Sequence, residues 1–239
     1  MSFCSASMSK RIVLFDALRG LSILLMLVHH FAIDLIGLGI LPTWLVNNPI
    51  VEVLWFVFAS TFILLCGFSS EFARNNRKRG VIILIFAYVL TFVTSFIPGA
   101  HIRFGILHLL GFCILLDSFF KPHLRAVSYR TWFYLFALGY IAFILINAGF
   151  WRNPDHLWML GIVGENFASA DFFPLMPWFF LFELGTHLGI AAKEERLPKW
   201  VYACRFKILP VIGRHTLVIY LVHQPIFYGV LYLLGLYKF

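Results

Sequence analysis

Residues 12–37 read IVLFDALRGLSILLMLVHHFAIDLIG, an almost unbroken apolar stretch that is long enough to cross a bilayer as one helix. Its charged groups share one face, because at about 100° per residue Asp16, Arg19, His30 and Asp34 point within roughly 60° of one direction. A charge at membrane depth costs at least about 2.5 kcal/mol, and such residues normally face a bundle interior or a watery cavity. We therefore expect this segment to be a transmembrane helix that lines a functional site.

The composition of the whole chain agrees with a membrane protein. Hydrophobic residues make up 61% and charged residues 13% of the chain, and the mean hydropathy is +0.88, whereas soluble domains carry about 25% charged residues. The sequence predicts an all-α polytopic membrane bundle, with residues 1–239 as a single integral membrane domain. No length remains for a separate soluble catalytic domain, so any chemistry must take place among the helices.

Seven apolar segments have the length of membrane spans, at residues 12–37, 51–68, 81–97, 104–120, 132–150, 172–191 and 216–236. If the N-terminus is cytoplasmic, fifteen of the nineteen basic residues fall on the inner side, whereas Arg103, Arg152 and Lys238 fall outside and Arg19 lies within the membrane. The positive-inside rule therefore predicts a cytoplasmic N-terminus and an outer C-terminus. The basic residues of the predicted inner segments also account for the net charge of +8. We therefore expect no nucleic-acid partner.

Two connecting segments contain apolar residues that do not belong to a predicted span. The outer segment 151–171 includes the apolar stretch 157–163, which is too short to span and fits either a lid or re-entrant piece or a plain loop. The inner segment 193–214 mixes six basic residues with aromatic ones, as does a helix that lies on the inner leaflet. The four cysteines show no CxxC spacing, so we predict no metal site.

Three histidines are the candidate catalytic groups. His30, His108 and His223 lie on three different predicted spans, and Asp171 stands at the predicted outer mouth of a fourth. His223 and Gln224 belong to a one-sided polar stripe on the last span. We expect these side chains to share one site in the outer half of the membrane; the alternative is that each histidine only hydrogen-bonds a neighbouring helix.

Two pairs of oppositely charged side chains lie one helical turn apart. Asp16 and Arg19 are three residues apart, and Glu183 and His187 are four residues apart, so either pair fits an ion pair that lowers the cost of insertion. A role in function remains the alternative for both.

Several ordered motifs resemble one protein family. The first is FDALRGL at 15–21, followed by Met26 and the two histidines at 29 and 30. The others are LCGFS at 65–69, FGILHLLG at 104–111, DFFPLMPW at 171–178 and GRHTLVIYLVHQP at 213–225. In this order they resemble the catalytic-domain family of heparan-α-glucosaminide N-acetyltransferase, and the chain looks like one of its small prokaryotic members. Arg19 and His30 are also, more distantly, similar to the Arg-x10-His signature of the membrane O-acyltransferases.

The resemblance implies a transmembrane acyltransferase in the cytoplasmic membrane of a prokaryote. Acetyl-CoA engages from the cytoplasm, and the acetyl group reaches an amino sugar or another small acceptor on the far side. On physical grounds the basic inner rim attracts the phosphates of CoA, and we assign Arg19, Asp16 and Gln224 to the donor. A histidine of the outer half acts as general base, or His30 carries the acetyl group covalently.

Two other classes of function compete with the acyltransferase. A proton-coupled exporter or flippase would use the same buried histidine and acidic residues as a proton relay. A heptahelical receptor or retinal protein is disfavoured, because the last span lacks a lysine for a Schiff base and the predicted orientation is opposite. The expected partners are the lipid bilayer, acyl-CoA and the acceptor, and assembly into a homo-oligomer stays open.

Overall fold

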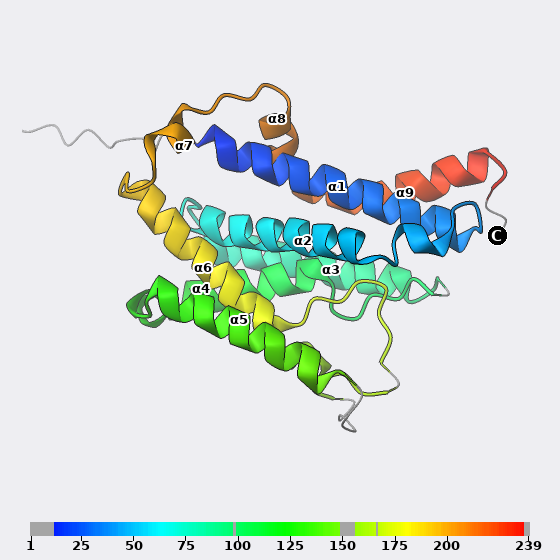
Figure 1. Ribbon diagram of the computed structural model, residues 1–239, viewed down its shortest axis with the longest axis horizontal. Coiled ribbons are helices and arrows are strands. Elements are labelled where there is room, and N and C mark those ends of the chain that lie inside the picture. Colours follow the sequence, from blue (N-terminus) through cyan, green and yellow to red (C-terminus); the bar gives the residue numbers. More distant parts are fainter. Residues whose placement is uncertain (1–11, 98, 149–155, 166, 237–239) are drawn as a thin grey trace, which may run out of the picture. The chain divides into compact units, whose positions relative to one another are not determined.

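The computed structural model describes residues 12–97, 99–148, 156–165 and 167–236, which are largely helical (Figure 1). The elements in chain order are α1 (Val13–Gly37), η1 (Thr43–Leu45), α2 (Pro49–Ser70), α3 (Asn76–Thr94), α4 (Ile106–Ala126), α5 (Tyr129–Ile146), η2 (Trp158–Leu160), α6 (Leu175–Lys193), α7 (Lys199–Ala203), α8 (Leu209–Arg214) and α9 (Thr216–Leu233). These described residues form no strand beyond an isolated bridge between Phe104 and Phe172. The predicted all-α membrane class is confirmed.

Six of the described helices are long and apolar enough to cross a membrane: α1, α2, α4, α5, α6 and α9. The remaining predicted span, 81–97, corresponds to α3, which begins earlier, at Asn76. Its first turn carries Arg77, Lys78 and Arg79, and these charges leave too short an apolar run for α3 to meet the same criterion. A seventh span and the orientation of the termini therefore stay predictions.

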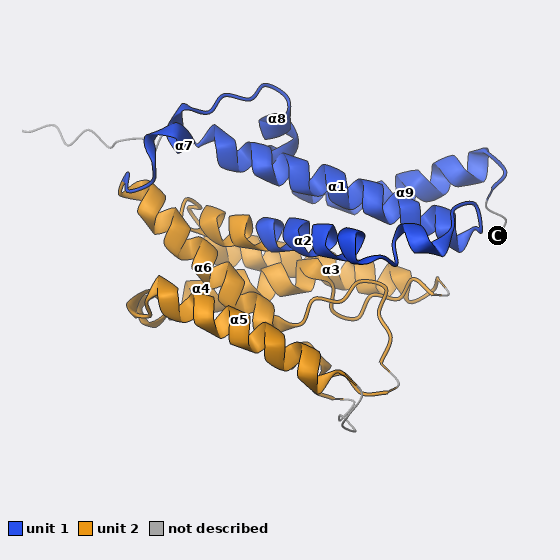
Figure 2. Cartoon of the chain, viewed as in Figure 1, with its two compact units in different colours: residues 1–62, 195–239 blue, residues 63–194 orange. Residues whose placement is uncertain are grey.

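The chain divides into two compact units, residues 1–62 with 195–239 and residues 63–194 (Figure 2). In the first unit α1 packs against α8 and α9. The contact with α8 is a close backbone approach, because a Cβ atom on Gly20 would lie 2.1 Å from the carbonyl oxygen of Leu209, and one on Gly213 would lie 1.9 Å from that of Asp16. Glycine on both helices is what allows this approach, as in small-residue contacts between membrane helices.

In the second unit α3 packs against α4, α5 against α6, and α4 against α6. The C-terminal part of α2 also lies directly on α6, because a Cβ atom on Gly67 would lie 2.0 Å from the carbonyl oxygen of Phe182 and one on Gly185 would lie 2.0 Å from that of Leu64. Helices α4 and α6 are the most buried of the membrane-spanning candidates. They therefore form the core into which this unit places its polar groups.

The two connecting segments differ from simple loops. The connecting segment 193–214 contains two short helices, α7 and α8, in place of the single surface helix that we predicted; Pro198 is the N-cap of α7, and Pro210 lies in the first turn of α8. In the connecting segment 151–171, residues 151–155 and 166 lie outside the described residues, and 156–165 contain the single turn η2. Asn147 binds this part to the end of α5: its amide nitrogen donates to the carbonyl of Gly161 and its amide oxygen accepts from the backbone of Val163.

Candidate functional site

The first unit brings His30 of α1 and His223 of α9 together. Their ring centroids lie 5.3 Å apart, and His29 contacts His30 at 6.1 Å. Phe31 and Phe227 meet at 5.0 Å beside them. These are two of the three histidines that the sequence predicts to share one site.

The hydrogen bonding of His223 leaves one ring nitrogen with a free lone pair. Its Nδ1 lies 2.6 Å from the backbone carbonyl oxygen of Tyr220, and a carbonyl only accepts, so Nδ1 carries the proton of the neutral ring. The opposite nitrogen, Nε2, is buried and has no hydrogen-bond partner among the described residues. The side chain is 6% exposed. A neutral imidazole in this state is ready to take a proton from a bound molecule.

Gln224 follows His223 on α9, and its side chain is a hydrogen-bonding neighbour of Asp34 on α1. Arg19 lies eleven residues before His30 in the same uninterrupted helix, so the two are separated by about 16 Å along the axis. The first unit thus places Arg19 well away from the histidine pair on one helix, and Gln224 directly beside it.

Asp16 lies where α1 meets α8. It is 9% exposed, and its Oδ2 atom lies 3.9 Å from Nε of Arg214. Its backbone carbonyl is also the group that Gly213 approaches. The N-terminal end of α1 therefore contacts a basic side chain that is distant in sequence.

His108 and Asp171 come together in the second unit, at the N-terminus of α4. The backbone N–H of Gly105 donates to Nδ1 of His108 at 3.2 Å, and that of Ile106 donates to Oδ2 of Asp171 at 2.9 Å. Because Nδ1 of His108 accepts, Nε2 carries the proton and donates to Oγ1 of Thr91 at 3.2 Å. Both ring nitrogens of His108 are thus engaged, and both side chains satisfy donors that a helix N-terminus leaves open.

Arg125, in the last turn of α4, forms the centre of a buried ionic cluster in the second unit. Its guanidinium donates hydrogen bonds to the carboxylates of Glu71, Asp117 and Glu183, the last over 2.9 Å. The side chains of Asp117 and Glu183 are completely buried, and that of Glu71 is 4% exposed. Oδ2 of Asp117 and Oε1 of Glu183 have no hydrogen-bond partner within the described ranges.

Two lysines complete the cluster at its exposed edge. Nζ of Lys121 lies 3.1 Å from Glu71, and Nζ of Lys193 lies 3.6 Å from the same carboxylate. Burial alone raises the pKa of Glu71, but the hydrogen bonds and positive charges of Arg125 and Lys121 outweigh it, so the pKa of Glu71 lies below its ordinary value. Three basic side chains thus face three acidic ones.

This cluster was not predicted from the sequence, although one signal for it was present. Asp117, Lys121 and Arg125 follow one another at intervals of four residues and so share one face of α4.

The predicted side-chain pair of Glu183 with His187 is wrong: Nδ1 of His187 contacts the backbone carbonyl of Glu183, whose carboxylate is bound by Arg125. A long-range arginine is the stronger partner because it binds the buried carboxylate directly with a full charge.

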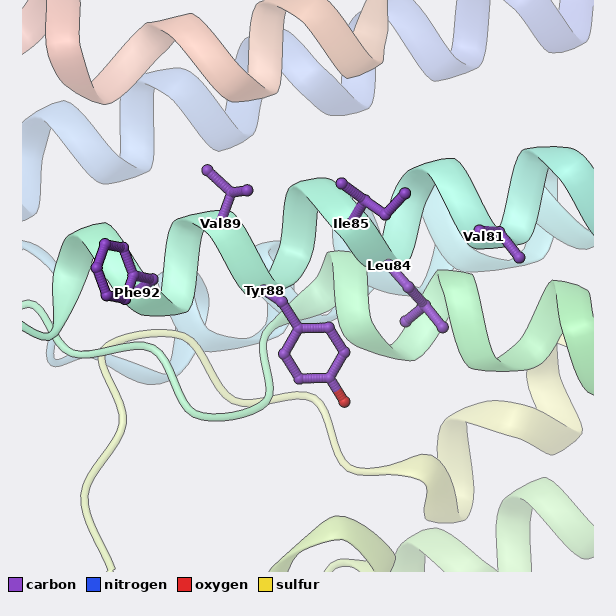
Figure 3. Close-up of a pocket in the computed structure, with 6 residues that line it drawn as sticks. All are labelled: Val81, Leu84, Ile85, Tyr88, Val89 and Phe92. Atoms are coloured by element: carbon purple, nitrogen blue, oxygen red, sulfur yellow. The ribbon is translucent and has the colours of Figure 1, made fainter.

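A shallow hollow of about 480 Å³ lies along α3, lined by Val81, Leu84, Ile85, Tyr88, Val89 and Phe92 (Figure 3). Its lining is almost wholly apolar, and several of these side chains are strongly exposed. Tyr88 is the one link to a candidate residue, because its ring meets that of His108 edge-on at 5.0 Å. A hollow in which Tyr88 alone among the lining side chains carries a polar group is suited to lipid chains.

The candidate residues are thus distributed over both units. His30, His223, Gln224, Arg19 and Asp16 lie in the first unit, and His108 and Asp171 lie in the second. The convergence of all three histidines on one site stays a prediction. Within the described ranges, no group of three or more His, Cys, Asp or Glu side chains is arranged to hold a metal ion.

Comparison with known families gives one match, which covers most of the chain. Residues 11–225 match the family described as heparan-alpha-glucosaminide N-acetyltransferase, catalytic. No curated protein and no solved structure matches the chain. The matched range extends from the start of α1 to the middle of α9 and includes every candidate residue. The protein therefore belongs to the family of the heparan-alpha-glucosaminide N-acetyltransferase catalytic region, as the ordered motifs predicted, and is an integral membrane protein of the transferase type.

Proposed function

We propose that this protein is a membrane-embedded acyltransferase that moves an acetyl group from cytoplasmic acetyl-CoA to an amino sugar or another small acceptor on the far side. The family match over residues 11–225 supports a transferase, and six apolar helices support its location in a bilayer. We further propose that this bilayer is the cytoplasmic membrane of a prokaryote.

The observation that carries the proposal is the unpartnered Nε2 atom of His223 beside His30. Two imidazoles from α1 and α9 lie 5.3 Å apart, and one of them presents a buried lone pair. A buried polar atom without a partner costs about 1–3 kcal/mol, so a purely structural role would be expected to satisfy it. A general base needs this free acceptor, within reach of the proton that it removes.

The proposed reaction is direct transfer. The acceptor nitrogen or oxygen attacks the thioester carbonyl, a C–N or C–O bond forms, and the C–S bond breaks. The proton of the nucleophile passes to Nε2 of the base and then to the sulfur, so that the products are the acetylated acceptor and CoA with a free thiol. In the covalent alternative, His30 takes the acetyl group first and passes it to the acceptor in a second step.

The donor is proposed to approach from the inner end of α1. Arg19 and the basic inner segments attract the phosphates of CoA, and the ion pair of Asp16 with Arg214 fixes a further cation there. Arg19 lies about 16 Å along α1 from His30, so an extended donor would have to span that distance to bring its thioester to the histidines. His108 and Asp171 enter the proposal as structural residues, because they accept hydrogen bonds from the backbone at the N-terminus of α4.

The test is acetyl transfer by the purified full chain in detergent or nanodiscs. With acetyl-CoA and D-glucosamine, we expect free CoA thiol and an acceptor heavier by one acetyl group in the mass spectrum. We expect His223→Ala and His30→Ala to abolish turnover while the protein still inserts and binds CoA. His123→Ala is the matched control, because this exposed histidine lies outside the proposed site. Inertness toward acetyl-CoA with every acceptor tried would count against the proposal.

A proton-coupled transporter is the second candidate, and one observation favours it. Asp117 and Glu183 are completely buried, and each has one oxygen without a partner in the described parts of the chain. Buried carboxyls of this kind occur in proton relays of membrane transporters. Counterflow of a substrate into liposomes without any acyl donor, abolished by Glu183→Gln, would favour transport over transfer.

A further inference from the structure

Four buried side-chain atoms of α1 and α9 have no hydrogen-bond partner in the ranges that the structure describes. They are Nδ1 of His29, Oδ2 of Asp34, Nε2 of His223 and Oε1 of Gln224. Native proteins leave few such atoms unpaired, and where they do, water or a ligand commonly fills the gap. Four on two neighbouring helices therefore indicate a place where a polar molecule binds.

The chemistry of these atoms determines what that molecule must offer. Oδ2 of an ionised Asp34 and the amide oxygen of Gln224 only accept hydrogen bonds. Nε2 of His223 also accepts, because Nδ1 of the neutral ring holds the proton and donates to Tyr220. Three acceptors cannot satisfy one another. Their complement is a molecule that donates several N–H or O–H groups.

The arrangement of the two helices places these acceptors around the proposed base. His30 faces His223, Phe31 faces Phe227, and Gln224 is the neighbour of Asp34. Asp34 lies one helical turn, or about 6 Å, beyond His30 along α1. Gln224 follows directly after His223, whose ring Phe227 meets edge-on at 5.7 Å. A molecule held by Asp34 and Gln224 would therefore lie within about one turn of both histidines.

We propose that Asp34 and Gln224 are positioning and specificity-determining residues for the acceptor. They bind an acetyl acceptor that carries at least two N–H or O–H groups besides its nucleophile. An acetyl acceptor with the same nucleophile but an otherwise apolar structure should bind less tightly. This inference rests on the proposed acyl transfer. It moves Gln224 from the donor, to which the sequence analysis assigned it, to the acceptor.

The test measures acceptor binding to the full chain in detergent without acetyl-CoA, by isothermal titration calorimetry. The probes are D-glucosamine, which combines an amine with several hydroxyls, and cyclohexylamine, which keeps the amine on an apolar ring. We expect the wild type to bind D-glucosamine more tightly than cyclohexylamine. Asp34→Leu and Gln224→Leu should each raise the Kd for D-glucosamine at least about tenfold, because each removes a buried acceptor, and should leave the Kd for cyclohexylamine unchanged.

Two further variants separate a lost contact from a disturbed fold. Gln224→Asn keeps both the acceptor oxygen and the amide N–H donor, so its Kd for D-glucosamine should rise clearly less than that of Gln224→Leu. Val230→Leu changes an exposed residue nearly two turns further along α9 and should leave binding unchanged. Equal affinity of the wild type for both probes, or unchanged binding in both leucine variants, would overturn the inference even if acetyl transfer is observed. Selective binding without acetyl transfer would instead overturn the proposed function.

Discussion

Arg125 of α4 donates a hydrogen bond to Glu183 of α6 over 2.9 Å, and the same guanidinium holds Asp117 and Glu71. These contacts join the two most buried helices of the second unit and the chain just beyond α2. Glu71 also has Lys121 and Lys193 as partners, but the ion pairs of the completely buried Asp117 and Glu183 are formed with Arg125. A buried ion pair adds little net stability, but the loss of one partner leaves the remaining buried charges without compensation.

Arg125→Leu is therefore expected to destabilise the second unit by about 3–5 kcal/mol, because it leaves buried carboxylates without their partner. The measurement is thermal unfolding of the purified protein in detergent, followed by size-exclusion chromatography after heating. Arg130→Leu is the control, since Arg130 is an exposed residue at the start of α5. Equal unfolding temperatures for the two variants would show that the cluster does not hold the helices together.

The stabilisation that the ionised Glu71 provides should be lost at low pH. The pKa of Glu71 is lower in the folded protein than its ordinary value of 4.5, so the folded state binds the proton less well than the unfolded state. The stabilisation is fully present above that ordinary value and is lost as the pH falls through the lower folded value. We expect the difference in unfolding temperature between the wild type and Glu71→Gln to shrink below a pH of about 4.5. A constant difference down to the acid limit of the assay would contradict this.

The contact between α2 and α6 provides a test of close helix packing. A Cβ atom at position 185 would lie 2.0 Å from the carbonyl oxygen of Leu64, so Gly185→Ala must push the two helices apart. We expect a loss of about 1–3 kcal/mol in the free energy of unfolding. Gly229→Ala on α9 is the matched control, because nothing lies within 4 Å of its added Cβ and alanine favours a helix. Both variants can be compared by the same thermal assay.

Much of the fold could be predicted from local sequence. Apolar length and one-sided polar stripes identified α1 and α9 and indicated that His30 and His223 point inward, since both signals act over a few helical turns. The start of α3 was missed, because Arg77, Lys78 and Arg79 look like a loop by hydropathy although Asn75 caps a helix there by accepting from the backbone of Lys78.

The ionic cluster could not be predicted in the same way. Its partners, Glu71, Arg125 and Glu183, are separated by more than fifty residues, and only the packing of α4 on α6 brings them together. The spacing of Asp117, Lys121 and Arg125 indicated a charged face of α4 but not the residues of other segments that pair with it. Likewise, Asp16 has Arg214 as a partner only because Gly20 and Gly213 allow α1 and α8 to approach closely.

The hydrogen bonds of His108 and His223 predict different responses to the same substitution. His108 accepts from the backbone of Gly105 and contacts Thr91, so His108→Ala should lower the free energy of unfolding by about 1–3 kcal/mol, through the backbone donor that it leaves unpaired. Turnover per folded molecule should then stay within about threefold of the wild type. His223→Ala removes a free acceptor and should instead reduce kcat per folded molecule by about 10²–10⁴-fold, whatever stability is lost with this buried side chain. Acetyl transfer normalised to the folded fraction measures both effects. A large loss of kcat in His108→Ala at full stability would move the general base from α9 to α4.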